Sequence, residues 1–595
     1  GVEQVPDSLE LRISLADKLA QRGATVALKA QIVEMARIGL NPQYLDYYEA
    51  YYAVNMKDWT GARRILVEKL QSLDLSNQLA LRASVNDLIS RCYAHLGDPE
   101  RQRAALNSSV RDNPNNISVR VEWIADLAAQ GEVDQAIDEY RKLAPQVPQV
   151  RLLLVDQLLI RNQRTPETRR DWKEIEDLIA LAAKDAPQAP QPVLAKARVL
   201  QAQGKSSEAK SVLEAAVGRD SKGPGVASLW AALAGLQTNF PAALKVLDDA
   251  QAKLGDQFEF RIARAKILAA RGGPDTTAAL TAVTENLNAL PTEQRVDVLQ
   301  AVAAELSRRD DPAGAARLMA QAASMAPNDL QPRLLLLSLG IQADDKAFIE
   351  QALAEIRRIE GPESNNARYG EVEYKIWQAK VKKDPAEQAR LRSEARTMLA
   401  ELSARRPDWS VIPLATAKLD EEDLKLATDE NDKKQRQSRL ADLYRQAVDM
   451  GQRNLAVVRR GTEMLVASGR TAEVTQLWNK VPILSGNGEL SGLERTVLNS
   501  VISDKDYKSA LEIVRQRVEA RPDSFAERIL LVQLLLAEKR PDEAEAELNK
   551  AVALDRSDAN RWVALVQYLV SSKQIDKAEQ AVKDLQKAVP ADNLA

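Results

Sequence analysis

Apolar residues near the end of the chain recur at helical spacing in two consecutive segments. In "NRWVALVQYLVSSKQIDKAEQAVKDLQKAVPAD", Trp562 and Leu565 lie three residues apart, and Ala578 and Val582 lie four residues apart. Positions three or four apart share one face of an α-helix. Polar residues separate the two segments, and Pro590 follows the second one. The pattern predicts two amphipathic helices joined by a short turn.

The same pattern recurs along the chain at an interval of about 34 residues. A small residue marks the second helix each time, at Ala136, Ala209, Ala510, Ala544 and Ala578. Glycine stands near the turn between the helices, at Gly23, Gly97, Gly131, Gly204, Gly273 and Gly469. This order resembles the tetratricopeptide repeat, a helix–turn–helix unit with the pattern W-x2-L, then A-x3-F, then Pro. The resemblance extends over nearly the whole chain.

The resemblance implies an all-α fold, a right-handed α-solenoid of about sixteen helix–turn–helix repeats. A single pair of helices cannot bury its apolar face, so stability depends on stacking between neighbouring pairs. Gly361, Pro362 and Ser364 interrupt the helical period in "RIEGPESNNARYGEVEY", which predicts a long loop there. We therefore divide the chain into an N-terminal array, 1–366, and a C-terminal array, 367–595, with a joint near 361–370.

Composition narrows the classes of partner. The 82 basic and 85 acidic residues are interspersed and give a net charge of −3, so no basic surface predicts a nucleic-acid partner. No apolar run reaches the roughly 18 residues that a membrane-spanning helix needs. Because the chain begins at Gly1 without an initiator methionine, we expect flanking segments, including any signal or anchor, to lie outside it.

The residues of common catalytic and metal sites are scarce. His95 is the only histidine and Cys92 the only cysteine, and nothing in the sequence orients them as a base and a nucleophile. Two such residues are too few for the usual histidine and cysteine metal sites. We predict no catalytic residues, no metal site and no cofactor, and therefore a protein that is not an enzyme.

Tyrosines are concentrated in one segment, "NPQYLDYYEAYYAVNMKDW". Five of the chain's twelve tyrosines lie there, at Tyr44, Tyr47, Tyr48, Tyr51 and Tyr52, on a helical arc of about 140°. In the repeat family, the first helices of successive repeats line the concave surface, where extended peptides bind. The repeat register turns Tyr44, Tyr47 and Tyr51 toward that surface, and Tyr48 and Tyr52 toward neighbouring helices. The alternative is that all five rings pack as an N-terminal core and cap.

The next repeat adds Asp87, Arg91 and His95 to the same surface, four residues apart from one to the next. With Tyr44, Tyr47 and Tyr51, they form the predicted partner-binding set. An internal ion pair between Asp87 and Arg91 is the alternative interpretation for two of them.

These observations predict a protein interaction scaffold that binds a partner polypeptide along its concave surface. The usage of Ala, Arg and Asp resembles long bacterial arrays attached to the cell envelope, which implies a role in an envelope assembly and a periplasmic or envelope location. Two alternatives remain open. One is a carbohydrate-binding array in surface polysaccharide export, with a polysaccharide as the ligand, and the other is a cytoplasmic assembly subunit.

Overall fold

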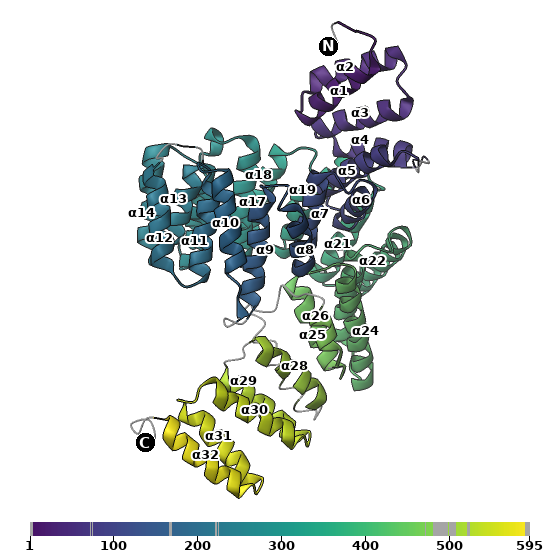
Figure 1. Ribbon diagram of the computed structural model, residues 1–595. Helices are drawn as coiled ribbons and strands as arrows, with labels where there is room; N and C mark the ends of the chain where they lie inside the picture. Colours follow the sequence, from purple (N-terminus) through teal and green to yellow (C-terminus); the bar gives the residue numbers. More distant parts are fainter. Residues whose placement is uncertain are drawn as a thin grey trace. The chain divides into compact units, whose positions relative to one another are not determined.

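The computed structural model describes residues 4–71, 73, 75, 77–165, 169–219, 223, 225–470, 472–479, 498, 502, 507–520 and 524–589. Over these residues the protein is all-α, with 31 α-helices, about 80% of the chain in helix and no β-strand (Figure 1). Pro590, which closes the last predicted repeat, lies outside this part of the chain.

The helices follow one another in pairs. The first half of the chain contains α1 (Leu9–Gln21), α2 (Thr25–Ile38), α3 (Pro42–Asn55), α4 (Trp59–Arg64), α5 (Leu79–His95), α6 (Pro99–Asp112), α7 (Ile117–Ala129), α8 (Val133–Leu143), α9 (Val150–Arg164), α10 (Lys173–Asp185), α11 (Pro190–Ala202), α12 (Ser206–Arg219), α13 (Val226–Gly235), α14 (Phe240–Leu254), α15 (Phe258–Arg271) and α16 (Thr276–Ala282). A π-helical turn (Ile65–Gln71) extends α4, and a short 3-10 helix (Leu287–Ala289) follows α16.

The second half continues the pairs with α17 (Thr292–Arg308), α18 (Pro312–Met325), α19 (Gln331–Gln342), α20 (Lys346–Glu360), α21 (Asn365–Val381), α22 (Pro385–Arg405), α23 (Val411–Leu426), α24 (Glu430–Asp449), α25 (Leu455–Ala467), α26 (Ala472–Asn479), α28 (Tyr507–Ala520), α29 (Phe525–Ala537), α30 (Pro541–Leu554), α31 (Ala559–Ser571) and α32 (Ile575–Ala588). Fifteen pairs and α28 therefore lie within the described residues. This agrees with the prediction of about sixteen repeats.

Small residues allow the helices of each pair to approach closely. The predicted positions Ala136, Ala209, Ala510 and Ala544 are all 0% exposed, and Ala50 on α3 is 0% exposed as well. Contacts within pairs such as α5–α6 alternate with contacts between consecutive first helices, among them α1–α3, α3–α5 and α13–α15. The first helices thus form one layer of the array, as the resemblance implies.

The turn within most of the pairs uses a left-handed residue two positions after the first helix ends. Gly97 takes this place after α5 with a φ of 68°, because glycine has no Cβ to oppose that conformation. Repeats without glycine place another residue there with the same sign of φ, as Lys57 does at 59° after α3. The turn geometry is therefore kept even where the sequence signal is absent.

The chain forms two compact units. The first comprises Gly1–Gln157 and Lys173–Ala415, and the second comprises Leu158–Trp172 and Thr416–Ala595, so α9 and α23 each contribute to both. The boundary expected at 366/367 falls inside α21, in the first unit.

The long loop predicted around residue 361 is wrong. Only residues 361–364 separate α20 from α21. Gly361 ends α20 with a φ of 90°, and the Ser364 side chain accepts a hydrogen bond from the Ala367 backbone N–H at 3.2 Å. Ser364, one of the residues that predict the loop, instead caps α21, which begins at Asn365.

Candidate functional site

Helix α3 begins at a cap and places its tyrosines in two environments. The Asn41 side chain accepts a hydrogen bond from the Gln43 N–H, and Pro42 occupies the first turn, where a missing N–H costs nothing. Tyr48 is buried at 2% exposure, and its hydroxyl donates to Asp17 Oδ1 on α1 at 2.7 Å. As the register predicts, Tyr48 faces a neighbouring helix.

The other four tyrosines of α3 are half-buried. Tyr44, Tyr47 and Tyr51 pack against two core clusters, one around α1 and α2 and one that includes α5. The rings of Tyr47 and Tyr51 meet edge to face, with centroids 6.0 Å apart. Tyr52 instead packs only against the first cluster, and Lys29 Nζ lies 5.2 Å from its ring centroid. These four rings therefore pack against neighbouring helices and also keep exposed area.

Helix α5 brings two of the predicted charges to the tyrosines. Arg91 donates from Nη2 to Asp87 Oδ2 at 2.9 Å, so the internal ion pair is present. Asp87 is only 9% exposed, and its Oδ1 is buried without a hydrogen-bond partner. Burial raises the pKa of Asp87, and the charge of Arg91 opposes that rise. An unpaired carboxylate oxygen in such a place is costly, and native structures rarely leave one without a reason.

Ionisable groups on α3, α5 and α7 influence one another electrostatically. Burial and the neighbouring Tyr51 raise the pKa of Tyr47, to which Asp87 contributes as well. Burial lowers the pKa of Arg91, but Asp87, then Tyr51 and Glu122, together raise it above the usual value. Burial and the Asp87 charge raise the pKa of Glu122 on α7. We call these residues, with Tyr44, the α3–α5–α7 surface.

Glu122 was missed by the sequence analysis. It lies about one repeat, or about 34 residues, beyond Asp87. Acidic residues at corresponding places on two consecutive first helices were the signal that could have revealed it. No hydrogen bond or ion pair involves its carboxylate within the described part of the chain, although it lies near both Asp87 and Arg91.

His95 is not part of this surface. It stacks on Trp59, with ring centroids 3.8 Å apart and planes 7° apart, and its Nδ1 lies 2.9 Å from Asp329 Oδ2. Gln331 donates to the carbonyl oxygen of the neighbouring Ala94. Trp59 and Asp329 thus hold the ring of His95, although its spacing predicted one row with Asp87 and Arg91.

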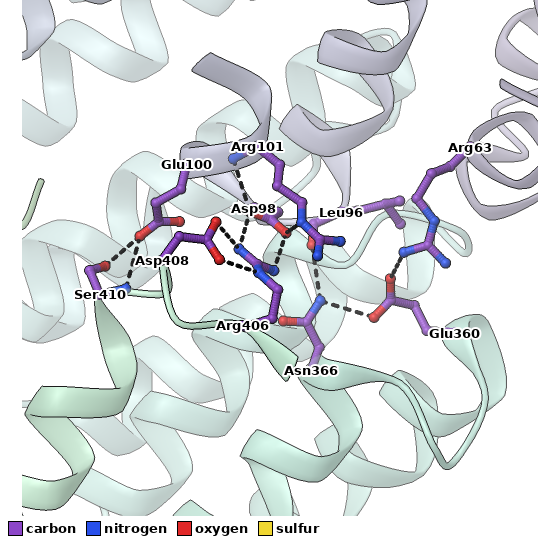
Figure 2. A network of polar contacts seen from close by, with 10 residues as sticks. All are labelled: Arg63, Leu96, Asp98, Glu100, Arg101, Glu360, Asn366, Arg406, Asp408 and Ser410. Carbon is purple, nitrogen blue, oxygen red and sulfur yellow. Dashed lines mark hydrogen bonds and ion pairs between the residues drawn. The ribbon is translucent and has the colours of Figure 1, made fainter. Parts of the chain in front are cut away.

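His95 belongs to a larger contact that closes the first unit. Arg63 pairs with Glu360 at 3.0 Å, and Asn366 donates to the Leu96 carbonyl oxygen at 3.2 Å (Figure 2). Repeats built from α3 to α6 therefore contact repeats built from α17 to α23, far along the chain.

Arg406 is the most buried charge of this closing network. Its guanidinium is 1% exposed and donates to both oxygens of Asp98, at 2.7 and 3.1 Å (Figure 2). Arg406 also donates from Nε to Asp408 Oδ1, and its Cζ lies 5.2 Å from the ring centroid of Trp409. Asp98 also caps α6 by accepting from the Arg101 N–H. A fork of guanidinium donors matched to a carboxylate is the strong form of an ion pair.

A second surface feature lies elsewhere in the first unit. A cavity of about 650 Å³ opens between α10, α11 and α12. Ile179, Val193, Leu200 and Val212 form its apolar part, and Lys196 and Lys205 lie among its polar lining residues. It contains none of the residues that the sequence analysis selected.

Three findings concern the Cys92 thiol, metal sites and membrane-spanning helices. Cys92 is buried, and burial raises the pKa of its thiol to about 12, so the thiolate nucleophile is disfavoured. No cluster of three His, Cys, Asp or Glu side chains suited to a metal ion occurs in the ranges given above. Within the same ranges, every helix is too short or too polar to span a bilayer.

Comparisons with known proteins agree with the helix pairs. Residues 501–567 match the sequence model of a family described as tetratricopeptide repeat. No curated protein sequence matches the chain significantly. Among solved structures, yeast Tom70 is 12% identical, with 91% of this chain and 96% of that chain covered and a TM-score of 0.28.

Two further structures show the same kind of similarity. The Cut9–Hcn1 hetero-tetramer of the APC/C is 14% identical, with 94% of this chain and 96% of that chain covered and a TM-score of 0.28. A tetratricopeptide repeat protein from Parabacteroides merdae is 13% identical, with 43% and 98% covered and a TM-score of 0.25. These scores do not establish a shared arrangement of repeats. Residues 501–567 are thus similar to the tetratricopeptide repeat, and helix pairs in the same register continue through the described residues.

Proposed function

We propose that this protein is a non-enzymatic scaffold that binds an extended segment of a partner polypeptide on the α3–α5–α7 surface. Tetratricopeptide-repeat proteins bind protein partners, and the fold is that of an interaction scaffold. One observation carries the choice of surface. Half-buried tyrosine rings on α3 adjoin the buried Asp87 carboxylate on α5, which keeps one oxygen without a partner.

The chemistry of these residues suits peptide recognition. Tyrosine offers a large rigid ring and a polar tip while losing little conformational freedom, so it is common at binding surfaces. Packing holds the rings of Tyr47 and Tyr51 at a fixed mutual angle, 89° between their planes. Asp87 Oδ1 is an acceptor that a donor of the partner can satisfy. The surface thus combines aromatic rings held in place by packing with a hydrogen-bond acceptor, Asp87 Oδ1, that has no partner.

Two observations support a role without catalysis. The ring of His95 is occupied by Trp59 and Asp329, and the Cys92 thiol is buried. The partner is expected to be a polypeptide, because tetratricopeptide-repeat proteins bind protein partners.

A random-peptide selection tests the proposal. Phage displaying random 12-residue peptides are selected on the immobilised full chain, and the affinities of synthetic copies are measured by fluorescence anisotropy. Tyr51→Ala and Tyr47→Ala are each expected to weaken binding by about tenfold or more, because truncating an aromatic anchor of an interface removes much of its binding energy.

Tyr52→Ala is the matched control. Tyr52 is a half-buried tyrosine of the same helix, but it packs beside Lys29 rather than α5. Its truncation is expected to leave the affinity within about twofold, as for contacts outside a hot spot. Binding that is equally sensitive to Tyr52→Ala and Tyr51→Ala, or sensitive to neither, would overturn the proposed surface, as would a selection that yields no binding peptide.

A further inference from the structure

The charges on the α3–α5–α7 surface do not balance. Asp87 and Glu122 contribute two carboxylates, while Arg91 is the cation that couples to both. Arg91 satisfies only Oδ2 of Asp87, and Oδ1 remains buried without a partner at a residue exposure of 9%. Glu122 has no ion pair among the described residues. The surface therefore holds an uncompensated negative charge, part of which is nearly desolvated.

The tyrosines near these carboxylates also favour a positively charged ligand. Tyr47 lies close enough to Asp87 for the carboxylate to influence its hydroxyl, and Tyr51 lies close to Arg91 on the same side. The face of a tyrosine ring attracts a cation through its quadrupole, more strongly when water is excluded. A carboxylate with a free oxygen near tyrosine side chains is a combination that suits an ammonium or guanidinium group.

We propose that this surface takes up one arginine or lysine side chain of the partner, held between the carboxylates of Asp87 and Glu122 and the rings of Tyr47 and Tyr51. The inference rests on the proposed function, because it assigns the partner chemistry of the same surface. The incoming cation donates to Asp87 Oδ1, which Arg91 leaves vacant, and pairs with Glu122. An arginine suits the position better than a lysine, since its planar fork can donate to two carboxylates at once.

The same peptide selection tests this inference when its sequences are aligned. Peptides selected on the unaltered chain are expected to share an arginine or lysine at one position, and replacing that residue by alanine is expected to weaken binding by about tenfold or more. Asp87→Asn is expected to weaken binding of the unaltered peptide by a similar factor. A selection on the Glu122→Lys variant is expected to lose the basic residue at that position and to enrich aspartate or glutamate.

Asp134→Asn is the matched control. Asp134 is an exposed carboxylate on α8, in the same repeat as Glu122 but on its second helix. Its removal changes the net charge by one unit, as Asp87→Asn does, and is expected to leave both the affinity and the selected motif unchanged. Circular dichroism checks that each variant is folded. Because Glu122 is exposed, Glu122→Lys is expected to fold, and it tests the proposal on its own if Asp87→Asn does not fold.

The outcomes separate the two proposals. Selected peptides that need Tyr47 and Tyr51 but carry no common basic residue would overturn the cation site and leave the proposed function standing. A basic preference that persists unchanged in Glu122→Lys and Asp87→Asn would also overturn it. A selection without binders would contradict both the surface and its charge preference.

Discussion

Replacing Arg406 by methionine is expected to lower the free energy of unfolding of the first unit by about 3–5 kcal/mol. Arg406 is 1% exposed, and its removal leaves the Asp98 carboxylate, with 11% of its side chain exposed, without its main partner. Breaking a buried ion pair on one side is more costly than the pair itself is stabilising, because a desolvated charge remains. Urea denaturation measures the loss. Hydrogen exchange in peptides that cover 401–412 locates it.

Two variants provide the controls. Glu293→Gln breaks the exposed Lys57–Glu293 pair, which joins the same two parts of the first unit at 2.9 Å with side chains 63% and 80% exposed. This change is expected to cost less than about 1 kcal/mol. The double variant Asp98→Asn with Arg406→Met removes both charges while asparagine still caps α6, so it is expected to recover part of the stability. Equal losses for Arg406→Met and Glu293→Gln would contradict a structural role for the buried pair.

Truncating Tyr48 to alanine is expected to destabilise the N-terminal repeats by about 3–5 kcal/mol, the usual cost of removing a buried aromatic side chain. Tyr48 is 2% exposed and packs between α1, α2 and α3. Tyr48→Phe keeps the ring but removes the donor to Asp17, and is expected to cost about 1–3 kcal/mol. Thermal unfolding measures the loss of stability in both variants, and hydrogen exchange in α1 to α3 locates it.

Tyr44→Ala is the comparison for Tyr48. Tyr44 belongs to the same helix but is half-buried, so its truncation exposes less apolar surface and is expected to cost clearly less. A Tyr48→Ala loss no larger than that of Tyr44→Ala would show that α3 does not separate a core tyrosine from a surface row.

The repeat architecture could be predicted because each unit repeats the same local requirements. Buried alanines such as Ala136 and Ala544 and turn residues such as Gly97 leave a periodic signal that needs no knowledge of distant contacts. The closing network could not be predicted. Arg406 and Asp98 are 308 residues apart, and neither differs in type from the many solvated charges around it.

The candidate site could be predicted in part. The register correctly grouped Tyr47, Tyr51, Asp87 and Arg91, because side chains on consecutive first helices face one another. His95, the last residue of α5, instead stacks on Trp59 and is hydrogen-bonded to Asp329. The envelope-associated role, the polysaccharide alternative and the compartment depend on partners rather than on this geometry, and they stay predictions.

Site-specific photocrosslinking tests the central claim most directly. Tyr44 is replaced by the photoreactive amino acid p-benzoyl-phenylalanine, which keeps an aromatic ring at the edge of the α3–α5–α7 surface, and a selected peptide is irradiated with the full chain. The same amino acid at Val212 reports on the cavity between α10, α11 and α12. Our account predicts a covalent adduct from position 44 that unlabelled peptide competes away, and none from position 212. An adduct from position 212 without one from position 44 would contradict it.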